Sequence, residues 1–186
     1  MKKIVLALMC MLLTAGASMA QKRFTFGPKV GVDLTHFWGE GVDHDVVFGY
    51  QGGLFAEYRA SDLIGIAPEV VFAAQGGKNS LGNTFHANYI NVPVMLKFYV
   101  VPAFSIDLGP QIGFNIYSKY TPADGSPAVD MSKYTKTVDF GAGLGATYNI
   151  ASDVFVQARY TMSFTKFMTA HNQKHGNAQI AIGYRF

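Results

Sequence analysis

Side chains that could bind a metal ion lie in the segments between the predicted strands. The first long segment contains the run Asp43-His44-Asp45, and later segments contain three more histidines. Imidazole and carboxylate groups are common ligands of divalent metals, and loops that meet at one rim could bring them together. The candidate ligands are His44, His86, His171 and His175. Their spacing matches no metal motif and fits a solvated polar rim, so the sequence predicts no bound metal or cofactor.

A second chemistry to consider is hydrolysis. It needs a nucleophile, a base and an orienting carboxylate within hydrogen-bond reach of one another. His36 is the one residue among the His, Lys, Arg, Asp and Glu types in the apolar rows of the predicted strands, so no Asp or Glu carboxylate accompanies it there. Asp43 and Asp45, together with the loop histidines, imitate a paired acid and base only weakly. We therefore predict that the protein is not an enzyme.

Charged residues share one face of the predicted strands. All of them have odd numbers, and five basic side chains balance five acidic ones. Opposite charges in a narrow interior should pair, because an unpaired buried charge is strongly destabilising. For Arg185 we expect partners such as Asp33, across the junction of the first and last strands. The predicted lumen charge network consists of Lys29, Asp33, Glu57, Arg59, Glu69, Lys97, Asp107, Asp139, Arg159 and Arg185.

The elements that must position these charges are β-strands. Side-chain character alternates with a period of two, and each segment is about as long as the roughly 9 to 11 residues of a tilted membrane strand. Eight strands are predicted, over 24–38, 48–59, 64–75, 90–100, 104–117, 138–150, 154–165 and 178–186.

The connections between these strands alternate in length. Tight turns are predicted at 60–63, 101–103 and 151–153, and longer segments rich in turn-forming residues at 39–47, 76–89, 118–137 and 166–177. Short connections on one rim, long ones on the other and both termini on the short side are typical of an up-and-down transmembrane barrel.

The even-numbered face of the strands distinguishes a membrane barrel from a soluble one. A soluble ligand-binding barrel alternates too, but its apolar face points inward. No even position in the eight strands is Asp, Glu, Lys or Arg, and a coat this apolar would aggregate in water. A charge at the bilayer midplane costs about 2 to 4 kcal/mol. We predict an all-β, eight-stranded antiparallel up-and-down transmembrane β-barrel with a polar, side-chain-filled lumen.

Four prolines lie within the predicted strands, at Pro28, Pro68, Pro93 and Pro110. Each lacks the N–H that a ladder needs, and a closed barrel has no edge strand to accommodate the loss. We expect bulges or rim positions at these residues.

Residues 1–20 have the features of a secretory signal. Two lysines precede an apolar run over 4–13, and small residues end at Ala20. The run is too short for a retained anchor helix, and the residues before Cys10 do not suit a lipoprotein signal. We predict a cleaved signal peptide and a single barrel domain over 21–186.

The bulk composition argues against two further classes of protein. The chain has 186 residues, 49% of them hydrophobic and 14% aromatic, but no later apolar run reaches the roughly 18 residues of a spanning helix. Cleavage lowers the formal net charge from +3 to about +1, which provides no positive field for nucleic acid. It also removes the only cysteine, so disulfides are not expected.

Several strand segments resemble a known family. They are YQGGLFAEYRASD (50–62), PEVVFAAQGG (68–77), NYINVPVMLKFYV (88–100) and SIDLGPQIGFNI (105–116). These segments resemble the outer-membrane β-barrel domain family of Gram-negative bacteria, also described as porin-like or PorT-like, and the resemblance covers 21–186.

The resemblance implies an outer-membrane location, contact with membrane lipid and assembly by the barrel-insertion machinery. It also implies that the C-terminal aromatics Tyr184 and Phe186 act as the assembly signal. It supplies no catalytic residues and no substrate.

The function predicted from these features is structural or interactive. A monomeric barrel with a plugged lumen would present four extracellular loops to an unidentified extracellular or envelope partner. The alternatives are a small porin for ions or small solutes and an accessory component of a secretion system. Balanced lumen charges argue against the porin, because they should pair and leave no continuous water column.

Overall fold

Strands make up nearly all of the part of the chain that the computed structural model describes, which is residues 23–38, 47–78, 84–131, 137–165 and 174–186. No helix in these ranges is long and apolar enough to cross a membrane. The strands are β1 (Phe24–Trp38), β2 (Val47–Arg59), β3 (Ile64–Lys78), β4 (Thr84–Val101), β5 (Phe104–Thr121), β6 (Val129–Asp130), β7 (Val138–Asn149), β8 (Val154–Ser163) and β9 (Lys174–Tyr184).

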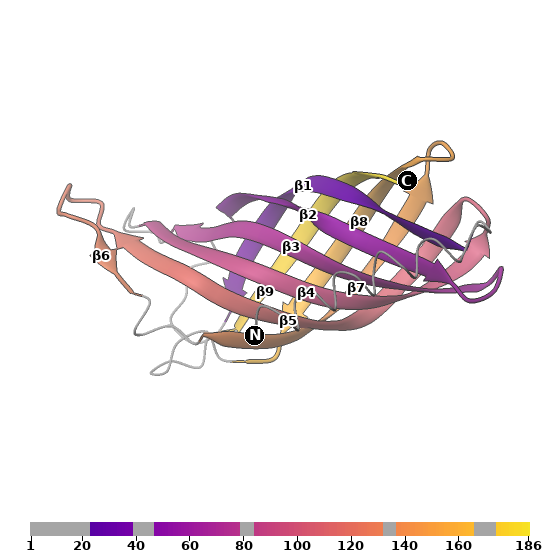
Figure 1. Ribbon diagram of the computed structural model, residues 1–186. Helices are drawn as coiled ribbons and strands as arrows, with labels where there is room; N and C mark the ends of the chain where they lie inside the picture. Colours follow the sequence, from indigo (N-terminus) through magenta and orange to yellow (C-terminus); the bar gives the residue numbers. More distant parts are fainter. Residues whose placement is uncertain (1–22, 39–46, 79–83, 132–136, 166–173) are drawn as a thin grey trace, which may run out of the picture.

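Eight long strands close into an antiparallel barrel (Figure 1). Each pairs with its neighbours along the chain, β1 pairs with β9, and β4 pairs with β5 in addition to β3. The predicted fold class is therefore confirmed. The additional strand, β6, has two residues and pairs with β5 outside the barrel wall; it is too short to produce a periodic signal in the sequence.

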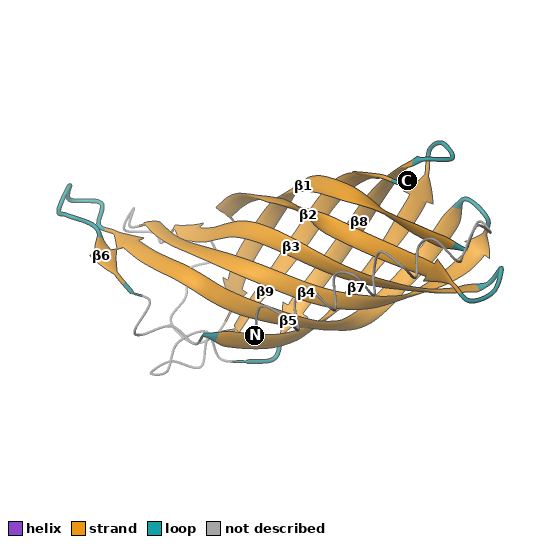
Figure 2. Ribbon diagram, in the orientation of Figure 1, coloured by secondary structure: helices purple, strands orange, loops and turns teal. Residues whose placement is uncertain are grey.

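The tight turns and the C-terminus lie at one end of the barrel, and β6 lies at the other (Figure 2). Ser61 stabilises the first tight turn, because its Oγ accepts hydrogen bonds from the backbone N–H groups of Leu63 and Ile64 at 3.2 and 3.1 Å. The backbone N–H of Phe186 donates to the carbonyl of Phe26 at 2.8 Å. The last residue of the chain therefore joins the wall beside β1.

Several strands extend further toward the long connections than predicted. β3 continues to Lys78 and pairs there with Thr84, the first residue of β4. Thr84 pairs in turn with Thr121 at the end of β5. Backbone pairing continues here after the apolar alternation has stopped, which is why the sequence pattern placed these ends too early.

Alternate residues along the strands face opposite sides of the wall. Val30 and Ile180 are 58% and 59% exposed on the outer surface, whereas Lys29 and Asp107 are 2% and 0% exposed in the lumen. In a bilayer the outer side chains meet lipid tails, while the polar side chains inside can bond to one another. The barrel thus has an apolar coat and a polar interior, as the alternation predicts.

The β4–β5 pair contains the two register shifts recorded between described strands. They fall between Asn88 and Tyr89 and between Tyr99 and Val101. At the first, Ile116 of β5 is the extra residue, and beyond it Ser118 rather than Tyr117 points inward. Each shift re-aims the side chains that follow it.

The expected bulges are absent at all four prolines, although Pro28 and Pro68 do lie near the turn end of the barrel, each as the fifth residue of its strand. The register is the same on both sides of each proline, and Pro93 is fully buried in the middle of β4. Beside Pro68, the pairing of β2 with β3 is interrupted between the pairs Phe55–Glu69 and Tyr58–Ile66. The register is the same before and after this interruption. A proline removes one donor but adds no residue, so it can interrupt a ladder without displacing it.

Candidate functional site

The lumen contains a buried carboxylate with two cationic partners. Glu69 of β3 accepts a hydrogen bond from Lys29 Nζ of β1 at 2.6 Å. Its two oxygens also accept hydrogen bonds from the two terminal nitrogens of Arg159 of β8, at 2.6 and 2.9 Å. The paired geometry of guanidinium and carboxylate makes this a strong charge-assisted contact. These bonds join three strands across the interior.

Neutral side chains extend this cluster to the far wall. Lys29 Nζ also donates to Gln157 Oε1 at 3.0 Å, and Gln157 Nε2 donates to Asp107 Oδ2 at 3.2 Å. Ser105 Oγ donates to Asp107 Oδ1 at 2.7 Å, and the Thr147 hydroxyl donates to Oδ2. Asp107 is thus held by neutral donors. The series of side-chain hydrogen bonds runs from Glu69 of β3 across the lumen to Asp107 of β5.

A second cluster surrounds Glu57, nearer the tight turns. Lys97 Nζ donates to Glu57 Oε2 at 3.0 Å, and the Tyr99 hydroxyl donates to Oε1. The guanidinium of Arg59 stacks on the Tyr99 ring, with its central carbon 3.6 Å from the ring centroid. Arg185 Nη2 lies 3.6 Å from Glu57 Oε2. Cations from β4 and the residue after β9 therefore lie against one carboxylate, and the Arg59 cation of β2 covers the Tyr99 ring that donates to it.

Arg185 does not pair with Asp33, so that expectation is wrong. Its other contacts are a 2.7 Å hydrogen bond from Nη1 to Asn149 Oδ1 and a stack on Phe155. The register places Gln179, not Arg185, opposite Asp33. Six residues of strand correspond to about 20 Å, which is too far for contact.

The two remaining acidic groups of the predicted network have different surroundings. Asp139 of β7 is half-buried and accepts hydrogen bonds from the hydroxyls of Ser163 and Thr165. Asp33 of β1 is fully buried, and neither of its oxygens has a hydrogen-bond partner. The network is therefore two ion-pair clusters, two carboxylates held by neutral donors and one carboxylate without partners.

The candidate metal ligands do not form a site in the part of the chain that the structure describes. His86 is exposed on β4. His44 and His171 lie outside the described residues, as does the side chain of His175, although its backbone belongs to β9. Among described residues no three His, Cys, Asp or Glu side chains are close enough to hold a metal ion.

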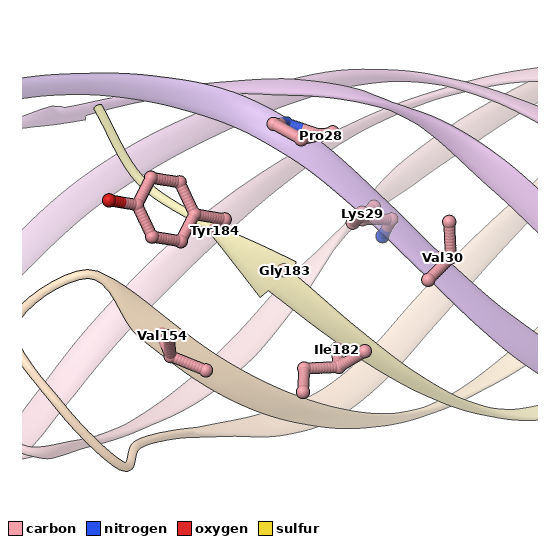
Figure 3. A pocket seen from close by; sticks show the side chains of 7 residues that line it. All are labelled: Pro28, Lys29, Val30, Val154, Ile182, Gly183 and Tyr184. Atoms are coloured by element: carbon pink, nitrogen blue, oxygen red, sulfur yellow. The ribbon is translucent and has the colours of Figure 1, made fainter.

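The outer surface carries no group of catalytic residues among those described. His36 Nε2 lies 3.2 Å from the Tyr160 hydroxyl, and the two rings stack with centroids 5.8 Å apart. An outer groove of about 300 Å³ where β1 meets β9 is lined largely by outward apolar side chains such as Val30, Ile182 and Tyr184 (Figure 3). A groove with this lining suits a lipid tail.

The C-terminal aromatics lie on the outer face at the turn end. Phe186 is 68% exposed, and its ring centroid lies 5.6 Å from that of Phe26 and 5.2 Å from that of Tyr184. This position would leave both terminal rings accessible to a protein that binds the last strand.

The predicted charge network did not include the neutral side chains that complete the charge clusters. Tyr99, Ser105, Thr147 and Gln157 all occupy inward, odd-numbered positions. Their odd numbering could have shown from the sequence that these side chains face the lumen. Their specific bonds depend on registers across several strands, which the pattern of one strand does not provide.

Comparison with known proteins gives the family. Residues 19–169 match the family described as outer membrane protein beta-barrel domain. The chain belongs to this family. It is therefore an outer-membrane β-barrel protein of the Gram-negative type, and its outer face contacts membrane lipid, as the resemblance implied.

Solved structures show the same fold. Ail of Yersinia pestis is 17% identical with a TM-score of 0.59, covering 88% of this chain and 99% of Ail. Neisserial surface protein A is 16% identical with a TM-score of 0.60, covering 87% of this chain and 97% of that protein. At such identities the likeness concerns the fold alone. The search of curated proteins gave no significant match.

Proposed function

We propose that this outer-membrane barrel is a non-conducting anchor that presents its long connections outside the cell to an extracellular or envelope partner. The main support is the contact of Glu69 with both Lys29 and Arg159, because these bonds cross the lumen where a pore would need continuous water. No catalytic role is proposed.

The placement of the connections supports the interaction role. Outer-membrane barrels have short periplasmic turns and longer extracellular loops. The tight turns of this chain lie at the same end of the barrel as its C-terminus. Ail, which has the same fold, has been solved in complex with the heparin analogue sucrose octasulfate. This complex is a precedent for ligand binding on the fold and makes that compound a reasonable first probe.

Labelling of single cysteines tests the orientation on which this proposal depends. The only native cysteine is Cys10, in the predicted signal. Ser126→Cys, in the connection between β5 and β6, should react with a membrane-impermeant maleimide on intact cells. Ser152→Cys, in the exposed turn between β7 and β8, is the matched control and should react only after the outer membrane is permeabilised. The opposite pattern would contradict the proposal.

A further inference from the structure

Asp33 differs from the other inward-facing charges. It is 0% exposed, and neither oxygen has a hydrogen-bond partner in the part of the chain that the structure describes. Burying a carboxylate charge without compensation is very unfavourable. Something must therefore neutralise this group in the folded barrel.

The described residues of the strands around Asp33 offer it no free cation. Gly49, opposite on β2, has no side chain, and Gln179, opposite on β9, donates from Nε2 to Thr161 at 3.3 Å. Lys29, four residues along β1, donates to Glu69 and Gln157. The donors that remain beside Asp33, the Asn177 amide and the Thr35 hydroxyl, are neutral, so neither cancels the charge of the carboxylate.

Two further oxygens beside Asp33 are also buried without partners. They are Thr35 Oγ1 and Asn177 Oδ1, on side chains that are 1% and 4% exposed. Thr35 follows Asp33 on the inward face of β1, and Asn177 pairs with Thr35 across the junction with β9. The Asn177 side chain lies next to the Asp33 carboxylate. Four unsatisfied oxygen atoms therefore gather at one place on the lumen wall.

We propose that Asp33, Thr35 and Asn177 form a binding site for a hard metal cation inside the barrel. The carboxylate supplies the negative charge, and the hydroxyl and amide oxygens supply neutral ligands. Sites made only of oxygen atoms suit cations such as Na⁺, Mg²⁺ or Ca²⁺, whereas zinc sites usually include nitrogen or sulfur. A cation here would hold β1 and β9 together where the first and last strands meet.

The test uses the full barrel, unfolded, treated with EDTA and refolded into detergent micelles so that the interior is accessible. Refolding is carried out with NaCl, MgCl₂ or CaCl₂, and with choline chloride at matched ionic strength. The thermal midpoint is read from heat-modifiable migration on gels. At about 100 times the Kd of a bound cation, at least one metal salt should raise the midpoint by roughly 5 °C over choline.

Variants separate this site from general effects of salt. Asp33→Asn should fold, since it removes an uncompensated buried charge, and its midpoint should be the same in metal salts and in choline. Thr35→Val keeps the carboxylate but loses one ligand. It should therefore need about tenfold more cation than the wild type for the same rise in midpoint, which corresponds to about 1.4 kcal/mol of binding free energy. Asp62→Asn, in an exposed turn, should respond like the wild type.

Two results would overturn the proposal. One is the same midpoint for the wild type in all four salts, which would mean that a proton neutralises Asp33. The other is an equal metal response in Asp33→Asn or Thr35→Val and in the wild type, which would place the cation elsewhere. If Asp33→Asn did not fold, the Thr35→Val titration would still decide the question.

Discussion

At the residue scale, the Glu69 carboxylate accepts three hydrogen bonds from two buried cations. Lys29 and Arg159 both donate to it, and all three side chains are almost completely buried. Removing one member of a buried ion cluster leaves the others without compensation, which is usually more harmful than replacing the whole cluster. Glu69 should therefore tolerate substitution less well than any exposed acidic residue.

Glu69→Gln should lower the free energy of unfolding by about 3 to 5 kcal/mol, because it leaves two buried cations without their anion. Asp62→Asn is the exposed control and should change it by less than about 0.5 kcal/mol. Urea titration of the refolded protein in lipid vesicles measures both. Adding Lys29→Met to Glu69→Gln should recover part of the loss. Equal stability of Glu69→Gln and the wild type would show that these ion pairs do not support the fold.

At the scale of the elements, strand type and facing were predictable from the sequence, while strand ends and contacts between strands were not. Alternation identified which residues of β1 and β9 face lipid, because each strand repeats every two residues. It could not reveal the extra residue at Ile116 or the continuous register at Pro93, since both depend on the neighbouring strand. The mistaken pairing of Arg185 with Asp33 has the same cause.

The last strand provides a prediction about assembly. Phe186→Ala should strongly reduce the folded protein recovered from outer membranes, because the terminal aromatic is the proposed assembly signal. It should change refolding of the purified chain into detergent only slightly, since Phe186 is mostly exposed. The control is Phe164→Ala, which removes another outward aromatic that is 58% exposed. Equal membrane levels of the two variants would refute the signal role.

At the scale of the whole molecule, two layers of hydrogen-bonded side chains cross the lumen, and we propose that they close it. The Glu69 cluster and its extension to Asp107 link strands on opposite walls, and the Glu57 cluster forms a second layer near the turns. Balanced charges at inward positions predicted a filled lumen. The sequence could not show which side chains bridge it, because Gln157 and Thr147 meet Asp107 only after the barrel has closed.

Single-channel recording in planar lipid bilayers tests the proposed closure of the lumen most directly. The purified full-length protein is inserted from detergent, and insertion is verified by heat-modifiable migration of the same preparation in vesicles. The bonded layers predict a baseline indistinguishable from that of detergent alone, with no steady conductance steps. Reproducible steps of uniform size would contradict the closed lumen and favour a small porin.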